Sequence, residues 1–129
     1  MKREIKFRAW DKENKKMKYN ITGIEYGNGD GNINGIFIDG DIYEIEKIEL
    51  MQYTGLHDKN GKEIYEGDIV KKTGSKEIDI GKVIYEYNGF IVDVMNMDRF
   101  YGRVHLLEKF TEVIGNIYDN PELLGGEDE

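Results

Sequence analysis

Few residues of this 129-residue sequence belong to the types that carry out catalysis. The only histidines, His57 and His105, lie far apart, and two histidines cannot form a three-ligand metal site without carboxylates. Asp58 follows His57, but neighbours on a strand point to opposite faces, so we do not expect an acid–base pair. Ser75, the only serine, lacks the G-x-S-x-G context of a hydrolase nucleophile. We therefore predict no catalytic residues and no enzyme activity.

One stretch has the donor spacing of a calcium loop. Asp30-Gly31-Asn32-Ile33-Asn34-Gly35 places oxygen donors at positions 1, 3 and 5 and glycine at position 6, and Asp41 falls at position 12. However, aspartate is a poorer bidentate ligand than glutamate at position 12. Residues 36–38 also have the composition of a strand, and no amphipathic helix precedes Asp30. We therefore expect no metal and no other cofactor.

Positive charge is concentrated at the start of the chain. Residues 1–20 hold eight Lys/Arg and three Asp/Glu, whereas the rest holds ten and 23. Strand alternation would place Lys6, Arg8 and Trp10 on one face, with Lys12 close by, which is a candidate platform for stacking and phosphate contacts. The simpler interpretation, which we favour, is that Trp10 covers the core and the basic segment pairs with the acidic body. An acidic body repels phosphate, so we consider nucleic acid an unfavoured partner.

The elements that must position these residues have the composition of strands. Gly is frequent (16), Pro occurs once, and Tyr and Phe together number 14, which favours a β-rich domain with many turns. Asp39-Gly40 and Asn88-Gly89 predict hairpin turns. Residues 43–50 fit both strand and helical spacing, and we predict a strand. Asn120-Pro121 predicts a helical turn with Asn120 as N-cap.

The stretch 51–70 predicts two strands joined by a turn. Asn60-Gly61 can close this turn because both residues tolerate positive φ. Gly67 should form a bend, and Asp68 should accept a backbone hydrogen bond that fixes it.

Three motifs together resemble the YopX family. The first is Lys6-Phe7-Arg8-Ala9-Trp10-Asp11 near the start. The central one is Gln52-Tyr53-Thr54-Gly55-Leu56, then Asp58-Lys59-Asn60-Gly61-Lys62-Glu63-Ile64, then Glu66-Gly67-Asp68-Ile69-Val70. The last is Val113-Ile114-Gly115-Asn116-Ile117-Tyr118 with Asn120-Pro121-Glu122-Leu123 near the end. The resemblance implies a phage or prophage origin and an SH3-type small barrel. It implies no established activity and no catalytic or binding residues.

We therefore expect a mainly β protein. Residues 1–50 would form a β-rich N-terminal portion, residues 51–118 an SH3-type small barrel, and residues 119–129 a short helical turn and polar tail. No apolar run is long enough to span a membrane, and no apolar segment follows the basic start as in a secretory signal. The absence of cysteine suits a reducing cytoplasm, here that of a bacterial host.

The expected function is a non-catalytic protein-interaction or self-assembly module with a host or phage protein partner. The alternative is nucleic-acid binding through Lys6, Arg8, Trp10 and Lys12. We also predict a homo-oligomer in which residues 1–20 contact the acidic body of a neighbouring subunit. The competing arrangement is a monomer whose basic segment folds back on its own acidic surface.

Overall fold

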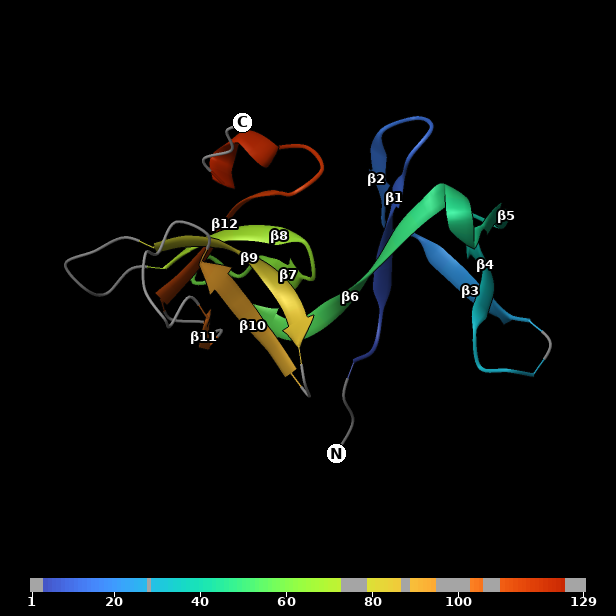
Figure 1. Cartoon of the computed structure of the whole chain (residues 1–129), viewed down its shortest axis with the longest axis horizontal. Helices are drawn as coiled ribbons and strands as arrows, with labels where there is room; N and C mark the ends of the chain where they lie inside the picture. Colours follow the sequence, from blue (N-terminus) through green and yellow to red (C-terminus); the bar gives the residue numbers. More distant parts are fainter. Residues whose placement is uncertain are drawn as a thin grey trace. The chain divides into compact units, whose positions relative to one another are not determined.

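The computed structural model describes residues 4–27, 29–72, 79–86, 89–94, 103–105 and 110–124. The chain is mainly β, as predicted, and divides into two compact units, Met1–Gln52 and Tyr53–Glu129 (Figure 1). The elements of the first unit are β1 (Phe7–Asp11), β2 (Lys16–Lys18), β3 (Ile21–Tyr26), β4 (Ile33–Ile38), β5 (Asp41–Glu44), the 3₁₀ helix η1 (Ile45–Lys47) and the first half of β6 (Ile48–His57). Those of the second are the rest of β6, β7 (Glu63–Tyr65), β8 (Asp68–Lys72), β9 (Asp79–Glu86), β10 (Gly89–Val94), β11 (Arg103–His105), β12 (Thr111–Asn116) and the 3₁₀ helix η3 (Pro121–Leu124).

The first unit packs two small sheets around an aliphatic core. One sheet has the order β2-β1-β6, and the other has the order β3-β4-β5. Ala9, Ile36, Ile38 and Ile48 are buried in the core between them. Because β1 pairs on both sides, with β2 and with β6, it is a central strand.

The hairpin from β4 to β5 confirms the turn predicted at Asp39-Gly40. Asp39 has φ 53° and Gly40 has φ 88°, which are the two positive angles of a type I′ turn. The predicted strand over 43–50 is correct only in part. Its middle, Ile45–Lys47, forms η1, and strands flank it on both sides. The helical spacing of its isoleucines thus corresponds to one real turn of helix.

The second unit is built on a curled sheet with the strand order β11-β10-β9-β8-β12, joined by the β6–β7 hairpin (Figure 1). Its core contains Ile64, Val70, Val83 and Val92. This is the small barrel that the sequence predicted. The pairing of β9 with β10 confirms the hairpin predicted around Asn88-Gly89, with Tyr85 opposite Phe90.

The bend between β7 and β8 has both features predicted for it, a glycine with positive φ and an aspartate that accepts a backbone hydrogen bond. Gly67 has φ 86°, which other residues rarely adopt. The Tyr65 N–H donates to Asp68 Oδ2 at 2.8 Å, so the buried carboxylate fixes the bend.

The turn predicted at Asn120-Pro121 is present: η3 begins at Pro121 and the Leu123 N–H donates to the Asn120 carbonyl at 3.0 Å, which places Asn120 at the N-cap position. Its side chain bonds elsewhere, because Oδ1 accepts the Asn116 N–H, four residues earlier, at 3.2 Å. The side chain therefore ties the turn back to β12. The pairing of β12 with β8 has a register shift between Val113 and Gly115. A Cβ on Gly115 would lie 2.6 Å from Asn120 Oδ1.

Some predictions fall outside the described residues. These concern the side chain of His105, Ser75 and the polar tail at 125–129. Within the part of the chain that is described, no helix is long and apolar enough to cross a membrane.

Candidate functional site

The carboxylate of Asp58, directly after β6, organises a turn in the second unit. Its Oδ1 accepts the N–H groups of Asn60 and Lys62, each at 2.9 Å. The Asp58 N–H donates to the Lys62 carbonyl at 2.7 Å, and Gly61 adopts φ 87°. The predicted turn at Asn60-Gly61 is therefore present, but Asp58 organises it, as an Asx turn.

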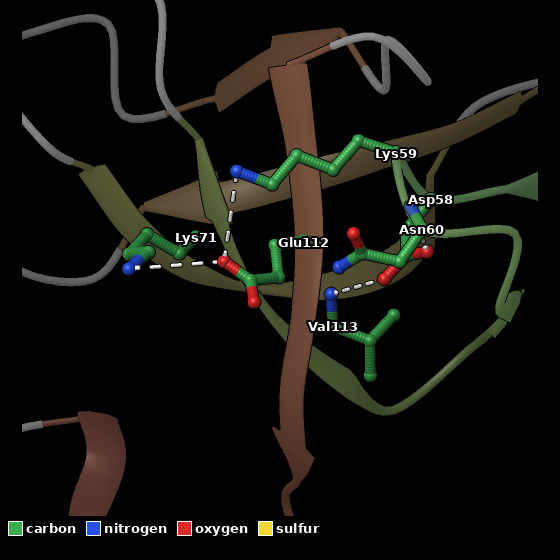
Figure 2. A network of polar contacts seen from close by, with 6 residues as sticks. All are labelled: Asp58, Lys59, Asn60, Lys71, Glu112 and Val113. Atoms are coloured by element: carbon green, nitrogen blue, oxygen red, sulfur yellow. Dashed lines mark hydrogen bonds and ion pairs between the residues drawn. The ribbon is translucent and has the colours of Figure 1, made fainter.

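The other oxygen of Asp58 reaches across the barrel to β12. Val113 N–H donates to Asp58 Oδ2 at 2.9 Å (Figure 2). Lys59 N–H donates to the Thr111 carbonyl at 2.9 Å. Thr111 and Val113 thus direct these backbone groups away from β8, their partner strand. The Asp58 turn covers this edge of β12 and closes the curled sheet.

Three hydrogen bonds keep the Asp58 carboxyl group ionised although it is only 5% exposed. Burial works to raise its pKa, but the backbone N–H groups of Val113, Lys62 and Asn60 outweigh burial. The pKa of Asp58 therefore lies below its usual value. A carboxylate whose oxygens are used in this way is suited to holding backbone and unsuited to accepting a proton at neutral pH.

Two lysines share one carboxylate next to this turn. Lys59 Nζ and Lys71 Nζ each lie 3.8 Å from Glu112 Oε1, and all three side chains are partly exposed (Figure 2). Exposed pairs of this length contribute little to stability.

The residues predicted as a basic binding face occupy two different environments. Arg8 and Trp10 are 3% and 8% exposed, and the Arg8 guanidinium lies 6.0 Å from the Tyr19 ring centroid. Lys6 pairs with Glu4 at 3.3 Å. Lys12 Nζ lies 3.2 Å from Glu49 Oε2 and donates to the Glu46 carbonyl at 3.1 Å. Lys6 and Lys12 thus have acidic or carbonyl partners within the first unit, and the side chains of Arg8 and Trp10 are buried.

The remaining titratable residues do not assemble into a reactive group. His57 is exposed and its Nδ1 lies 3.5 Å from the Tyr53 hydroxyl, whereas Asp58 is buried, so the two neighbours separate as expected. Asp30 accepts the Asn32 N–H at 2.9 Å in the loop before β4. Asp41 pairs with Ile38 at the far end of β4, so the ends of the calcium-like pattern lie apart. Among the described residues, no group of three His, Cys, Asp or Glu side chains could hold a metal ion.

Charge divides unevenly between the two units. Residues 1–52 contain nine Lys/Arg and ten Asp/Glu, a net charge of −1. Residues 53–129 contain nine Lys/Arg and 16 Asp/Glu, a net charge of −7. The basic start is therefore nearly balanced inside its own unit, and the barrel unit carries most of the negative charge.

Sequence reasoning missed Asp58 as the organising residue. The signal was present in Asp58-Lys59-Asn60-Gly61, because Asp before a glycine turn favours an Asx turn. The bond to Val113 has no local signal, since the two residues are 55 positions apart.

Comparison with known proteins agrees with this architecture. The chain matches a family model described as YopX protein over residues 6–125. No curated protein sequence matches it. The crystal structure of protein EF1440 from Enterococcus faecalis is similar, with a TM-score of 0.72 and 28% identity over 95% of this chain and 99% of that one. Protein YopX from Bacillus subtilis has a TM-score of 0.62 and 25% identity over 91% of this chain and 95% of that one. The chain, whose central motif closes a barrel in the way described above, belongs to the YopX family.

Proposed function

We propose that this protein is a non-catalytic protein-interaction or self-assembly module. We further propose that it is an accessory protein of a phage or prophage and acts in the cytoplasm of the bacterial host, as the family resemblance implies. The observation that carries the proposal is that the buried carboxylates of the described residues accept hydrogen bonds from backbone N–H groups.

Each buried carboxylate of the described residues is engaged by backbone. Asp11 Oδ1 accepts the N–H groups of Glu13 and Asn14, both at 3.1 Å. Asp68 holds the bend at Gly67, and Asp58 closes the barrel. General acid–base catalysis needs a group that can exchange a proton with substrate. These carboxylates instead accept backbone hydrogen bonds that stabilise turns.

The outward-facing surface has features that suit binding. Tyr19, Tyr26, Ile42 and Tyr85 are large apolar residues that are more than half exposed. Aromatic residues contribute strongly at protein interfaces. The −7 charge of residues 53–129 favours a partner with a basic surface and disfavours phosphate.

Nucleic-acid binding through Lys6, Arg8, Trp10 and Lys12 has weaker support. A stacking platform requires an accessible ring, and Trp10 is buried. Phosphate contacts would also have to displace Glu49 from Lys12.

Sedimentation of the full-length protein, together with cross-linking in cells that express it, tests the proposal. We expect either a mass above that of the monomer or a reproducible cross-link to one protein partner. A protein that sediments as a monomer and cross-links to no protein contradicts the proposed function.

A further inference from the structure

Two of the open strand edges among the described residues of the first unit carry opposite charge. β5 is the last strand of the order β3-β4-β5, and β2 is the last strand of the order β2-β1-β6-β7. Among the described residues, β5 pairs only with β4, and β2 pairs only with β1. An open edge presents unpaired backbone groups that can bind another strand.

The backbone of β5 shows which groups face outward. Ile38 and Asp41 flank the two-residue turn, so they form a hydrogen-bonded pair. Pairs alternate along the ladder, and the backbone groups of Ile42 and Glu44 therefore point away from β4. Ile42 is 54% exposed, which is unusual for isoleucine.

The same reasoning applies to β2. Lys12 N–H donates to the Lys47 carbonyl, on the side of β1 that faces β6. The alternate residues of β1, Ala9 and Asp11, therefore direct their backbone groups toward β2. Because Trp10 is opposite Met17, the backbone groups of Met17 point to the open side of β2.

Charge selects which edges can meet. Asp41 and Glu44 are exposed on β5, and Lys15 and Lys16 are exposed at β2. Two antiparallel β2 edges with Met17 opposite Met17 would place Lys16 opposite Lys18, and two β5 edges would bring two acidic strands together with no basic residue on either. Like charges directly opposite destabilise a ladder, whereas opposite charges stabilise it.

One register of β5 with β2 satisfies both backbone and charge. An antiparallel pair with Ile42 opposite Met17 places outward-facing backbone groups on both strands in hydrogen-bonding positions. It also brings Glu44 next to Lys15 in the turn before β2, where Lys15 has φ 56° and its N–H donates to the Asp11 carbonyl, so this contact would join side chains only. Asp41 falls opposite Lys18, and Lys16 lies two residues from Lys18 on the same strand. In its own chain, Lys18 Nζ lies 6.0 Å from the centroid of the Tyr43 ring.

We propose that the partner of β5 is β2 of a second copy of this chain. The inference rests on the proposed function, because it names the partner and the surface of a self-assembly module. The contact joins β5 of one copy to β2 of the other. In such a pair, the first copy keeps its β2 edge free and the second keeps its β5 edge free, so further copies can add. Such an interface forms rings when the rotation closes and filaments when it does not.

Complementary charge reversals provide the test. The first variant, Lys15→Glu with Lys16→Glu, makes both edges acidic, and the second, Asp41→Lys with Glu44→Lys, makes both edges basic. Each full-length variant alone should associate about tenfold more weakly than the wild type in sedimentation velocity, because opposite-charge pairs become like-charge pairs. An equimolar mixture should recover the wild-type mass, since every contact then joins an acidic edge to a basic edge.

Matched controls separate edge pairing from general charge effects. Lys47→Glu and Glu122→Lys are exposed charge reversals outside both strands and should keep the wild-type mass. Circular dichroism confirms that each variant is folded. If the edge variants keep the wild-type mass, or the mixture stays dissociated, the β5–β2 pairing is wrong while self-association stands. A monomeric wild type overturns the pairing outright, and the cross-linking experiment then decides the proposed function separately.

Discussion

Replacing Asp58 by alanine should remove the closure of the barrel. The carboxylate accepts three backbone N–H groups at 2.9 Å, from Asn60, Lys62 and Val113. Hydrogen bonds to a charged group are worth about 1.5–3 kcal/mol each, and three that share one carboxylate do not add fully. We therefore expect Asp58→Ala to lower the free energy of unfolding by about 3–5 kcal/mol, a large part of the roughly 5–15 kcal/mol typical of a domain.

Asp58→Asn is the matched control, because it preserves the shape and removes the charge. Its single carbonyl oxygen can keep the bonds from Asn60 and Lys62, but its amide then faces the Val113 N–H. We expect a smaller loss, about 1.5–3 kcal/mol. Urea unfolding followed by circular dichroism measures both values. If Asp58→Ala unfolds at the wild-type urea concentration with an unchanged slope, the three bonds do not hold the barrel closed.

The pH dependence of this effect has a defined sign. The pKa of Asp58 is lower in the folded state than in the unfolded chain, so the stabilisation is fully present above the unfolded pKa of about 3.9. It is lost as the pH falls through the lower, folded pKa. The difference between the wild type and Asp58→Asn should therefore shrink as the pH is lowered below about 4. A difference that stays constant into strong acid would contradict the assignment.

Three further outcomes follow from the described geometry. Gly67→Val should lower stability by about 1–3 kcal/mol in thermal melts because φ is 86°, whereas Gly89→Ala, with open space around it, should change little. Gly115→Ala should cost about 1–3 kcal/mol in urea unfolding, since its Cβ would clash with the side chain before η3; wild-type stability would show that this turn moves freely. Fluorescence anisotropy with single- and double-stranded oligonucleotides should show no binding that weakens steeply with salt, because Arg8 and Trp10 are buried. A steep salt dependence would favour the nucleic-acid function instead.

Local chemistry was readable from the sequence wherever one or two residues decide a conformation. The turn at Asp39-Gly40 and the bend at Gly67 depend on φ preferences and on a short side chain that bonds nearby backbone. Residues 43–50 gave a mixed signal because the chain there changes from strand to 3₁₀ helix and back.

Side-chain contacts between distant residues could not be read from the sequence. Asn120 has the N-cap position that its context predicts, but its Oδ1 accepts the Asn116 N–H at the irregular end of β12. The favoured interpretation that Trp10 covers the core agrees with its 8% exposure. The burial of Arg8 had no local signal, because strand order is not encoded in local periodicity.

The bond between Asp58 and Val113 has a consequence for how the barrel forms. Closing a loop of 55 residues costs about 3.5 kcal/mol in chain entropy, beyond a constant term. β12 also follows every other described strand of its unit in the chain, so it is synthesised after them. Until β12 docks, the side of β8 that it covers is open. Folding should therefore pass through a period in which a hydrophobic strand can recruit a neighbouring chain, and nascent chains held at high concentration would aggregate at this step.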